Sequence, residues 1–252
     1  MRVLIALVFM LAALPLRAEE VVLGLSKNQI SINTTFDGSE ILLFGAIKRD
    51  RAIPDGELGV IVAIAGPSQA VNVRRKERRF GIWVNVDAVE VDAAPSFYAV
   101  ATSGPLSDVL TEVEDLRHRI SIPRAIRSVG APTTVSDAQA FTEAVIRIRK
   151  ANGAYKVEEG AIDLAEQTLF QTQIELPANL TEGAYATRIF LTREGQVVSR
   201  YETVIDVRKV GMERWLFALS REQPILYGLM SLAIAIAAGW GASAAFRLLR
   251  QG

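Results

Sequence analysis

The sequence contains no cysteine and a single histidine, His118, among its 252 residues. Without cysteine the chain forms no disulfide, holds no metal through thiolates and has no thiolate nucleophile. One histidine is too few for a copper or zinc site, because such sites need several imidazole, thiolate or methionine ligands. The sequence therefore predicts no metal and no cofactor, and we expect His118 to lie on the solvated face of a helix.

The chain also lacks net charge, since 28 basic residues balance 28 acidic ones. A nucleic-acid partner would require a basic face that replaces counterions on the phosphates. The sequence has no glycine-rich phosphate loop and no recognisable serine–histidine–carboxylate set. We therefore expect no nucleic-acid binding and no enzyme activity.

The start of the chain has the layout of a secretory signal peptide. Arg2 precedes an apolar run of twelve residues from Val3 to Leu14, and Ala18 comes directly before two glutamates. The run is too short to cross a hydrocarbon core of about 30 Å. Cleavage is predicted after Ala18, with an uncleaved anchor as the alternative.

The end of the chain contains the one long apolar segment of the mature sequence. Ile225 to Phe246 is a run of twenty-two residues without a charge, which as a helix is long enough to cross a bilayer. Arg247 and Arg250 follow it, and such basic flanks favour the cytoplasmic side. The sequence predicts a single-pass inner-membrane protein with its bulk in the periplasm and its C-terminus in the cytoplasm.

Most of the exported part has the pattern of β-strands. From Val21 to Thr102, short alternating or apolar runs are separated by turn signals such as Asp37-Gly38, which is typical of a β-sandwich. Ile41–Ile47 and Leu58–Ala65 are almost continuously apolar and are expected to be buried central strands. Helical spacing then marks one helix over 106–120 and a second that Asn152-Gly153 ends.

Alternation returns after the helices, over Phe170–Leu176 and in a hairpin around Glu194-Gly195. The fold class expected is mainly β: immunoglobulin-like β-sandwich modules with a helical insert and one C-terminal transmembrane helix. The predicted segments are a signal peptide (1–18), a β-sandwich domain (19–103), a helical insert (104–153), a second β-rich module (154–210), a juxtamembrane segment (211–224), the transmembrane helix (225–246) and a cytoplasmic tail (247–252). Whether the second module is separate or extends the first stays open at this point.

Two groups of carboxylates could support acid–base hydrolysis, which commonly uses a pair of acids. One group is Glu112, Glu114 and Asp115, and the other is Asp87, Glu90 and Asp92. The first group also fits the wet face of an amphipathic helix, so we regard a carboxylate-dependent hydrolase as the less favoured alternative.

The densest charge cluster consists of Arg74, Arg75, Lys76, Arg78 and Arg79. Cations at this density can bind anionic lipid headgroups or an acidic partner, although a solvated hairpin explains them as well. Phe80 and Trp83 lie beside the run. A lipid- or glycan-binding sandwich, with an aromatic-lined cleft near Trp83 or Tyr98, is therefore a second alternative.

The apolar segment repeats small residues every four positions, at Ala233, Ala237, Gly241 and Ala245. Such a stripe lets helix backbones approach closely in lipid. A plain anchor does not need it, so we expect this helix to pack on itself or on a partner's membrane domain. The function expected is that of a non-catalytic protein-interaction or accessory subunit, for example of a transporter.

Short segments throughout the mature chain are similar to one known family. They are Leu43-Phe44-Gly45-Ala46, Lys76-Glu77-Arg78, Gly81-Ile82-Trp83-Val84-Asn85, Pro95-Ser96-Phe97-Tyr98-Ala99, Leu169-Phe170, Leu176-Pro177-Ala178, Tyr227-Gly228-Leu229 and Gly239-Trp240. On these segments the chain resembles the uncharacterised transmembrane proteins of alphaproteobacteria. The resemblance implies an exported, single-pass architecture and supplies no catalytic residue.

Overall fold

The computed structural model describes residues 19–33, 36–49, 52–128, 137–210 and 212–250. The predicted signal peptide (1–18) lies outside them. The chain divides into two compact units. One comprises Met1–Ile30 and Phe36–Val207, and the other comprises Ser31–Thr35 and Arg208–Gly252.

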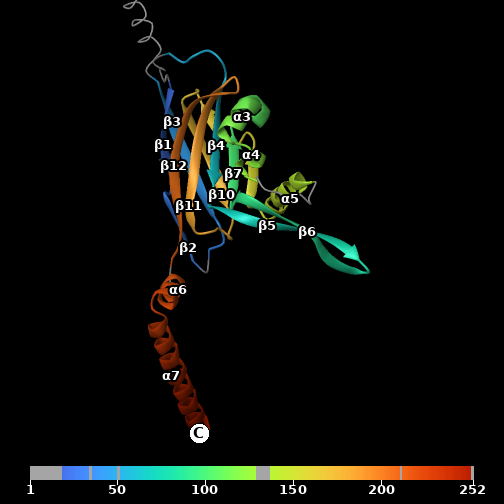
Figure 1. The fold of residues 1–252 in the computed structure, drawn as a ribbon. Coiled ribbons are helices and arrows are strands. Elements are labelled where there is room, and N and C mark those ends of the chain that lie inside the picture. The colour runs from blue at the N-terminus through green and yellow to red at the C-terminus, as the bar shows by residue number, and fades with distance from the viewer. Residues whose placement is uncertain (1–18, 34–35, 50–51, 129–136, 211, 251–252) are drawn as a thin grey trace, which may run out of the picture. The chain divides into compact units, whose positions relative to one another are not determined.

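The first unit is built on two sheets, and the smaller one has four antiparallel strands (Figure 1). In spatial order these are β1 (Glu19–Leu25), β3 (Ser39–Arg49), β10 (Leu169–Leu176) and β9 (Asp163–Ala165). Every second residue of β10 is buried, the alternation expected of a strand with one face toward the core.

The larger sheet has six strands. Their order is β2 (Gln29–Ile32), β12 (Gln196–Lys209), β11 (Gly183–Arg193), β4 (Leu58–Ala65), β7 (Tyr98–Thr102) and β8 (Tyr155–Glu158). β8 runs parallel to β7, whereas β11 is antiparallel to both β4 and β12. Strands from 19–103 and from 154–210 are therefore neighbours in both sheets, so the second predicted module extends the first sandwich.

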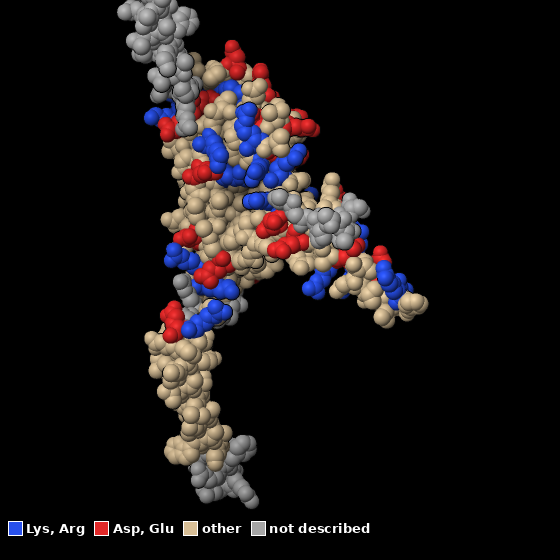
Figure 2. All heavy atoms as spheres, viewed as in Figure 1, with Lys and Arg blue, Asp and Glu red and all other residues tan. Residues whose placement is uncertain are grey.

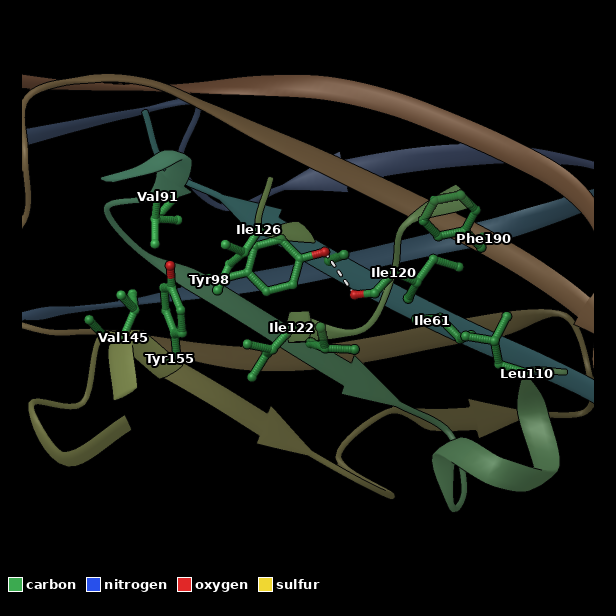
Figure 3. Close-up of a cluster of buried hydrophobic side chains, with 14 residues drawn as sticks. Ile61, Val91, Tyr98, Leu110, Ile120, Ile122, Ile126, Val145, Tyr155 and Phe190 are labelled. Carbon is green, nitrogen blue, oxygen red and sulfur yellow. Dashed lines mark hydrogen bonds between the residues drawn. The ribbon is translucent and has the colours of Figure 1, made fainter. Parts of the chain in front are cut away.

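Strand β4 lies within the core, since every residue from Leu58 to Ile64 is buried. A strand is buried at consecutive positions only when both of its faces are covered. On one face Ile61 and Ala63 join a cluster with residues of the helical segment, among them Ile120 and Val145 (Figure 3). The other face of β4 belongs to the interior of the sandwich. The predicted buried strand at Leu58–Ala65 is confirmed.

The described part of the insert contains four helices, which cover one face of the larger sheet (Figure 1). They are α2 (Leu106–Val109), α3 (Glu112–His118), α4 (Ile122–Ala125) and α5 (Ala138–Ala151). The single helix predicted over 106–120 is wrong. Leu110 is extended, and the amide of Thr111 donates to the carbonyl of Gly195 at 2.9 Å, so a tertiary bond replaces a helical one. The predicted end at Asn152-Gly153 is confirmed.

A long antiparallel hairpin forms a third sheet. Its strands are β5 (Ser68–Arg79) and β6 (Ile82–Pro95), and it projects from the sandwich (Figure 1). α5 packs against both strands. Val89 and Val91 are buried at the base, whereas the residues from Lys76 to Trp83 are exposed.

The second unit contains α6 (Met212–Glu222) and α7 (Pro224–Arg250). The 20 residues Pro224–Ser243 of α7 have a mean hydropathy of 1.8, and none of them is buried. α7 is thus long and apolar enough to cross a membrane. The structure confirms a mainly β fold with a helical insert and one C-terminal apolar helix.

Candidate functional site

One acid of each predicted carboxylate group, Asp115 in the first and Asp87 in the second, is held by contacts with neighbouring residues. Asp115 accepts hydrogen bonds from the amides of Ile120 and Ser121 and from the Ser121 hydroxyl, at 3.0, 2.7 and 2.6 Å. It therefore fixes the turn after α3, where Arg119 adopts a left-handed φ of 52°. On the hairpin, Asp87 lies 3.7 Å from the guanidinium of Arg75.

His118 is less solvated than the sequence predicts. Its ring contacts that of Phe190 at a tilt of 56°, with centroids 5.5 Å apart, and its Nε2 is 3.2 Å from the buried carboxylate of Glu114. Arg117 also binds Glu114, at 2.6 Å. Within the described ranges no group of three or more His, Asp or Glu side chains could hold a metal ion.

Tyr98 does not line an open cleft, because it is only 1 % exposed. Its hydroxyl donates to the carbonyl of Ile120 at 2.8 Å (Figure 3) and accepts from Arg188 at 2.9 Å. Burial raises the pKa of Tyr98 above its ordinary value, against the opposing charge of Arg188. Trp83, by contrast, lies near the hairpin end and is exposed. The two aromatic residues thus occupy different environments.

The five predicted basic residues fall on the outer part of the hairpin and divide into two sets. Arg75 contacts Asp87 and Asp137 and stacks on Phe141 at 4.7 Å. Arg79 pairs with Glu77 at 3.2 Å.

The other three cations, Arg74, Lys76 and Arg78, form no ion pair with any described residue. Alternate residues of a strand point to the same face, so these three share one face of β5. Trp83 pairs with Arg78 in the register and lies on that face too. In Figure 2 the projecting hairpin shows blue cations along its outer part and an uncharged end.

The turn at the end of this hairpin has a left-handed backbone, as the turn at Glu194-Gly195 also has. Phe80 and Gly81 connect the strands with φ values of 49° and 86°, and two positive values are typical of a type I′ turn. Asn, Asp or Gly normally occupies the first of these positions. Phe80 is fully exposed there, next to the exposed Ile82 and Trp83.

The outer face of the four-stranded sheet carries a second candidate surface, which the sequence does not predict. The exposed residues Val22, Leu42, Phe44 and Leu169 lie around a depression of about 690 Å³. The register places Ala46 between Val22 and Leu169, and Phe44 beside Gly24. A side chain at Gly24 would overlap the Phe44 ring, since a Cβ there would be 2.3 Å from it.

The prediction that Ile41–Ile47 is a buried central strand is right in its position, between β1 and β10, but wrong for its outer face. Ile41, Leu43 and Ile47 point into the sandwich, whereas Leu42 and Phe44 point outward. The signal in the sequence was the lack of polar residues at these alternate positions, which an ordinary solvated sheet face would contain.

The predicted helix-packing residues lie on α7. Ala233, Ala237 and Gly241 are exposed positions of that helix; a Cβ at Gly241 would meet no atom within 4 Å. Ala245 belongs to the same helix, but its side chain lies outside the described part. Spacing by four residues places these positions along one side of the helix.

The comparison with known protein families covers most of the chain. A family model whose description is "Putative transmembrane protein", Alph_Pro_TM, matches residues 20–248. A comparison with curated proteins found no match. The family match includes every described strand, apart from Glu19 at the start of β1, and all but the last two residues of α7. The chain therefore belongs to the Alph_Pro_TM family of transmembrane proteins.

Proposed function

We propose that this protein is a non-catalytic membrane subunit that binds another protein of the same membrane through the outer face of its four-stranded sheet. The observation that supports this most is the apolar surface formed by Val22, Leu42, Phe44 and Leu169, which we call the sheet patch. Contiguous apolar residues on the surface of a folded domain are typical of interaction sites. α7 would hold the domain beside the membrane, as in an accessory subunit of a transporter.

A protein fits the sheet patch better than a small molecule does. Small-molecule sites combine apolar walls with a few polar groups that orient the ligand. At the margin of this patch the amide of Gln171 donates to Asp163 at 3.4 Å, so these groups already bind each other. Phe44 in the middle of the patch is 47 % exposed, and aromatic residues, phenylalanine among them, are enriched in the cores of protein–protein interfaces.

The small-residue stripe on α7 would supply a second contact inside the bilayer. Ala233, Ala237, Gly241 and Ala245 offer little side chain to bury, but they allow another helix to approach closely. We propose the partner's membrane domain, or a second copy of this chain, as the helix that packs there. The two surfaces together would give more affinity than either alone, because binding at one raises the effective concentration at the other.

The proposed location follows from the ends of the sequence. The signal-peptide pattern at 1–18 and the basic residues Arg247 and Arg250 after the apolar run support a periplasmic domain and a cytoplasmic C-terminus at the inner membrane. The proposal that the subunit is non-catalytic rests on the contacts of Asp115 and Asp87, which leave neither acid poised for acid–base work.

The experiment that tests this function is site-specific photocrosslinking in the native host. A photoreactive amino acid at Leu42 should give one discrete adduct with another membrane protein, and the same group at Val204 should not. Val204 is a suitable control because it is also an exposed apolar strand residue, on β12 of the other sheet.

The substitution Phe44→Glu tests whether the adduct depends on the patch. We expect it to reduce the Leu42 adduct more than tenfold, because a charge must then be buried against the partner. The matched variant Val204→Glu should leave the adduct unchanged. An adduct with lipid, an adduct with a second copy of this chain, or equal yields from both variants would refute the proposed partner site.

A further inference from the structure

We propose that the end of the β5–β6 hairpin inserts into the anionic lipid surface of the bilayer that α7 spans. This contact is separate from the sheet patch and does not depend on a protein partner. Four features of the hairpin support it: the backbone of its turn, the exposed apolar end, the length that projects, and the cations that follow.

The turn is the first feature. A residue other than glycine in the left-handed region is strained by about 1–2 kcal/mol, and Phe80 has a φ of 49°. Its ring is fully exposed, so no described contact within the chain offsets this strain. Asparagine would adopt the same backbone with less strain. Strain of this kind is common at functional sites, and a large apolar ring at the end of a hairpin gains stability only by leaving water.

The residues beside the turn extend this apolar end. Ile82 and Trp83 are 65 % and 68 % exposed, so three large apolar side chains lie within four consecutive positions. Tryptophan prefers the membrane–water interface, where its ring is apolar and its N–H remains solvated. A single exposed apolar residue would need no explanation, but three at the end of a projecting element indicate a contact.

The hairpin is also long enough for shallow insertion. Arg75 of β5 contacts Asp137, at the N-cap of α5, and Phe141 within that helix. Phe80 lies five positions further along the chain, which at roughly 3.3 Å per residue is about 16 Å. The polar interface of a bilayer is only about 5–8 Å thick on each side. The end can therefore reach the acyl boundary while α5 remains outside the headgroups.

Charge favours an anionic lipid surface over other partners. Arg74, Lys76 and Arg78 lie on one face behind the apolar end and form no ion pair with any described residue, whereas Glu77 lies on the opposite face. With the hairpin inserted, its apolar end would lie among the acyl chains and the cations behind that end would lie at the depth of the lipid phosphates. A cation near anionic lipid is stabilised without directional contacts, which suits three long side chains on an open strand.

Because α7 would anchor the protein in the bilayer, the hairpin end needs only weak affinity for the lipid surface. α7 would confine the domain to the neighbourhood of one bilayer, so that hairpin insertion becomes an intramolecular step at high effective concentration. A few apolar side chains and three cations are adequate for a reversible contact under these conditions.

Trp83 itself provides the measurement. The chain has three tryptophans, and the substitutions Trp215→Phe and Trp240→Phe leave Trp83 as the sole emitter in the full-length protein. We would reconstitute this protein in nanodiscs with or without anionic phospholipid, with brominated acyl chains as quenchers. The emission of Trp83 should shift to the blue and be quenched in anionic discs, and do so much less in zwitterionic discs.

Two variants, each added to the Trp83-only protein, separate insertion from folding. Phe80→Asn removes the apolar ring but suits the turn, and should reduce the ratio of inserted to free hairpin by about 10- to 100-fold. Arg74→Gln, Lys76→Gln and Arg78→Gln together should reduce it by roughly 100-fold at low salt. The control is the neutralisation of Arg124, Arg147 and Lys150, which are exposed and lie off the hairpin; it should leave quenching unchanged.

The lipid assignment fails if Trp83 remains unquenched in anionic discs, or if the control variant reduces quenching as much as the hairpin variant does. It also fails if Trp83 becomes shielded only in native membranes that contain other proteins, since the hairpin end would then occupy a protein groove. None of these results depends on the sheet patch. They therefore neither support nor contradict the proposed partner site, which the photocrosslinking experiment tests.

Discussion

At the scale of single residues, a buried ion pair holds the first strand of the sandwich. Glu19 at the start of β1 binds Arg49 at 2.7 Å and Arg193 at 2.8 Å. Arg193 also donates to the carbonyls of Pro54 and Gly56, at 3.1 and 2.7 Å. All three side chains are at most 9 % exposed. Burial alone would raise the pKa of Glu19, but the hydrogen bonds and charges of Arg193 and Arg49 outweigh it and hold this pKa below its ordinary value.

The first prediction is that Glu19→Gln destabilises the protein by about 3 kcal/mol near neutral pH, because two buried guanidinium groups lose their counter-charge. A carboxyl with a lowered pKa in the folded state stabilises that state above its unfolded pKa, near 4.3, and loses this effect as pH falls through the folded pKa. The stability difference between wild type and variant should therefore be complete at pH 7 and shrink in acid.

Thermal unfolding of both full-length proteins in detergent, followed by circular dichroism between pH 3 and pH 7, measures this difference. Glu175→Gln serves as the control, because Glu175 is exposed in its pair with Lys156, and ion pairs at the surface contribute little to stability. A difference that stays constant down to pH 3 would contradict the role given to the Glu19 charge.

The second prediction concerns the hairpin turn. Phe80→Asn should raise stability by about 1 kcal/mol, because asparagine tolerates the left-handed backbone better than phenylalanine. Gly81→Ala should lower it by about 1 kcal/mol: φ is 86° there, although no atom lies within 4 Å of an added Cβ. The unfolding midpoint in urea measures both changes. If Phe80→Asn is as destabilising as Gly81→Ala, the strain assigned to Phe80 is absent.

At the scale of elements, the third prediction concerns α7. Ala237→Leu together with Gly241→Leu should disrupt association through this helix, because two large side chains prevent close approach. Ala238→Leu with Ala242→Leu adds comparable bulk on another side of the same helix and is the matched control. Chemical crosslinking in native membranes, with a reagent that does not require cysteine, measures the association. Equal crosslinking of both variants and the wild type would show that the stripe is not a contact surface.

The elements also show which features a single sequence can predict. The apolar run of α7 and the buried run of β4 were recognised, because length and continuous apolarity reflect burial in lipid or between two layers. β3 has the same kind of run, but its alternate residues form an exposed patch. Periodicity cannot distinguish a face covered by the chain itself from one left for a partner.

Other features depend on contacts between distant segments and had no local signal. The break between α2 and α3 follows from a bond to Gly195, about eighty residues further along the chain. The Glu19–Arg193 pair joins the first and the penultimate strand. Composition identifies the basic run, yet only the ion pairs of the folded chain separate Arg74, Lys76 and Arg78 from the paired Arg75 and Arg79.

At the scale of the whole molecule, the two halves of the chain contribute to each other's sheets. β3, from the first half, pairs with β10 over Leu169–Leu176, and β4 pairs with β11 over Leu58–Ala65. Either half alone would leave central strands with unpaired backbone groups and exposed apolar faces, which is unfavourable in water. Folding of the sandwich therefore has to wait for its last strands, after long loops have closed.

The last prediction tests this dependence. The fragment 1–128 should fail to fold alone, whereas its co-expression with 129–252, each led by residues 1–18 for export, should restore a protease-resistant complex. The break falls between α4 and α5, so it interrupts no described helix or strand. Limited proteolysis and co-purification through a tag on one fragment measure the outcome. If 1–128 alone resists protease and unfolds cooperatively, the first strands form an independent module and the pairing of β3 and β4 with later strands is dispensable.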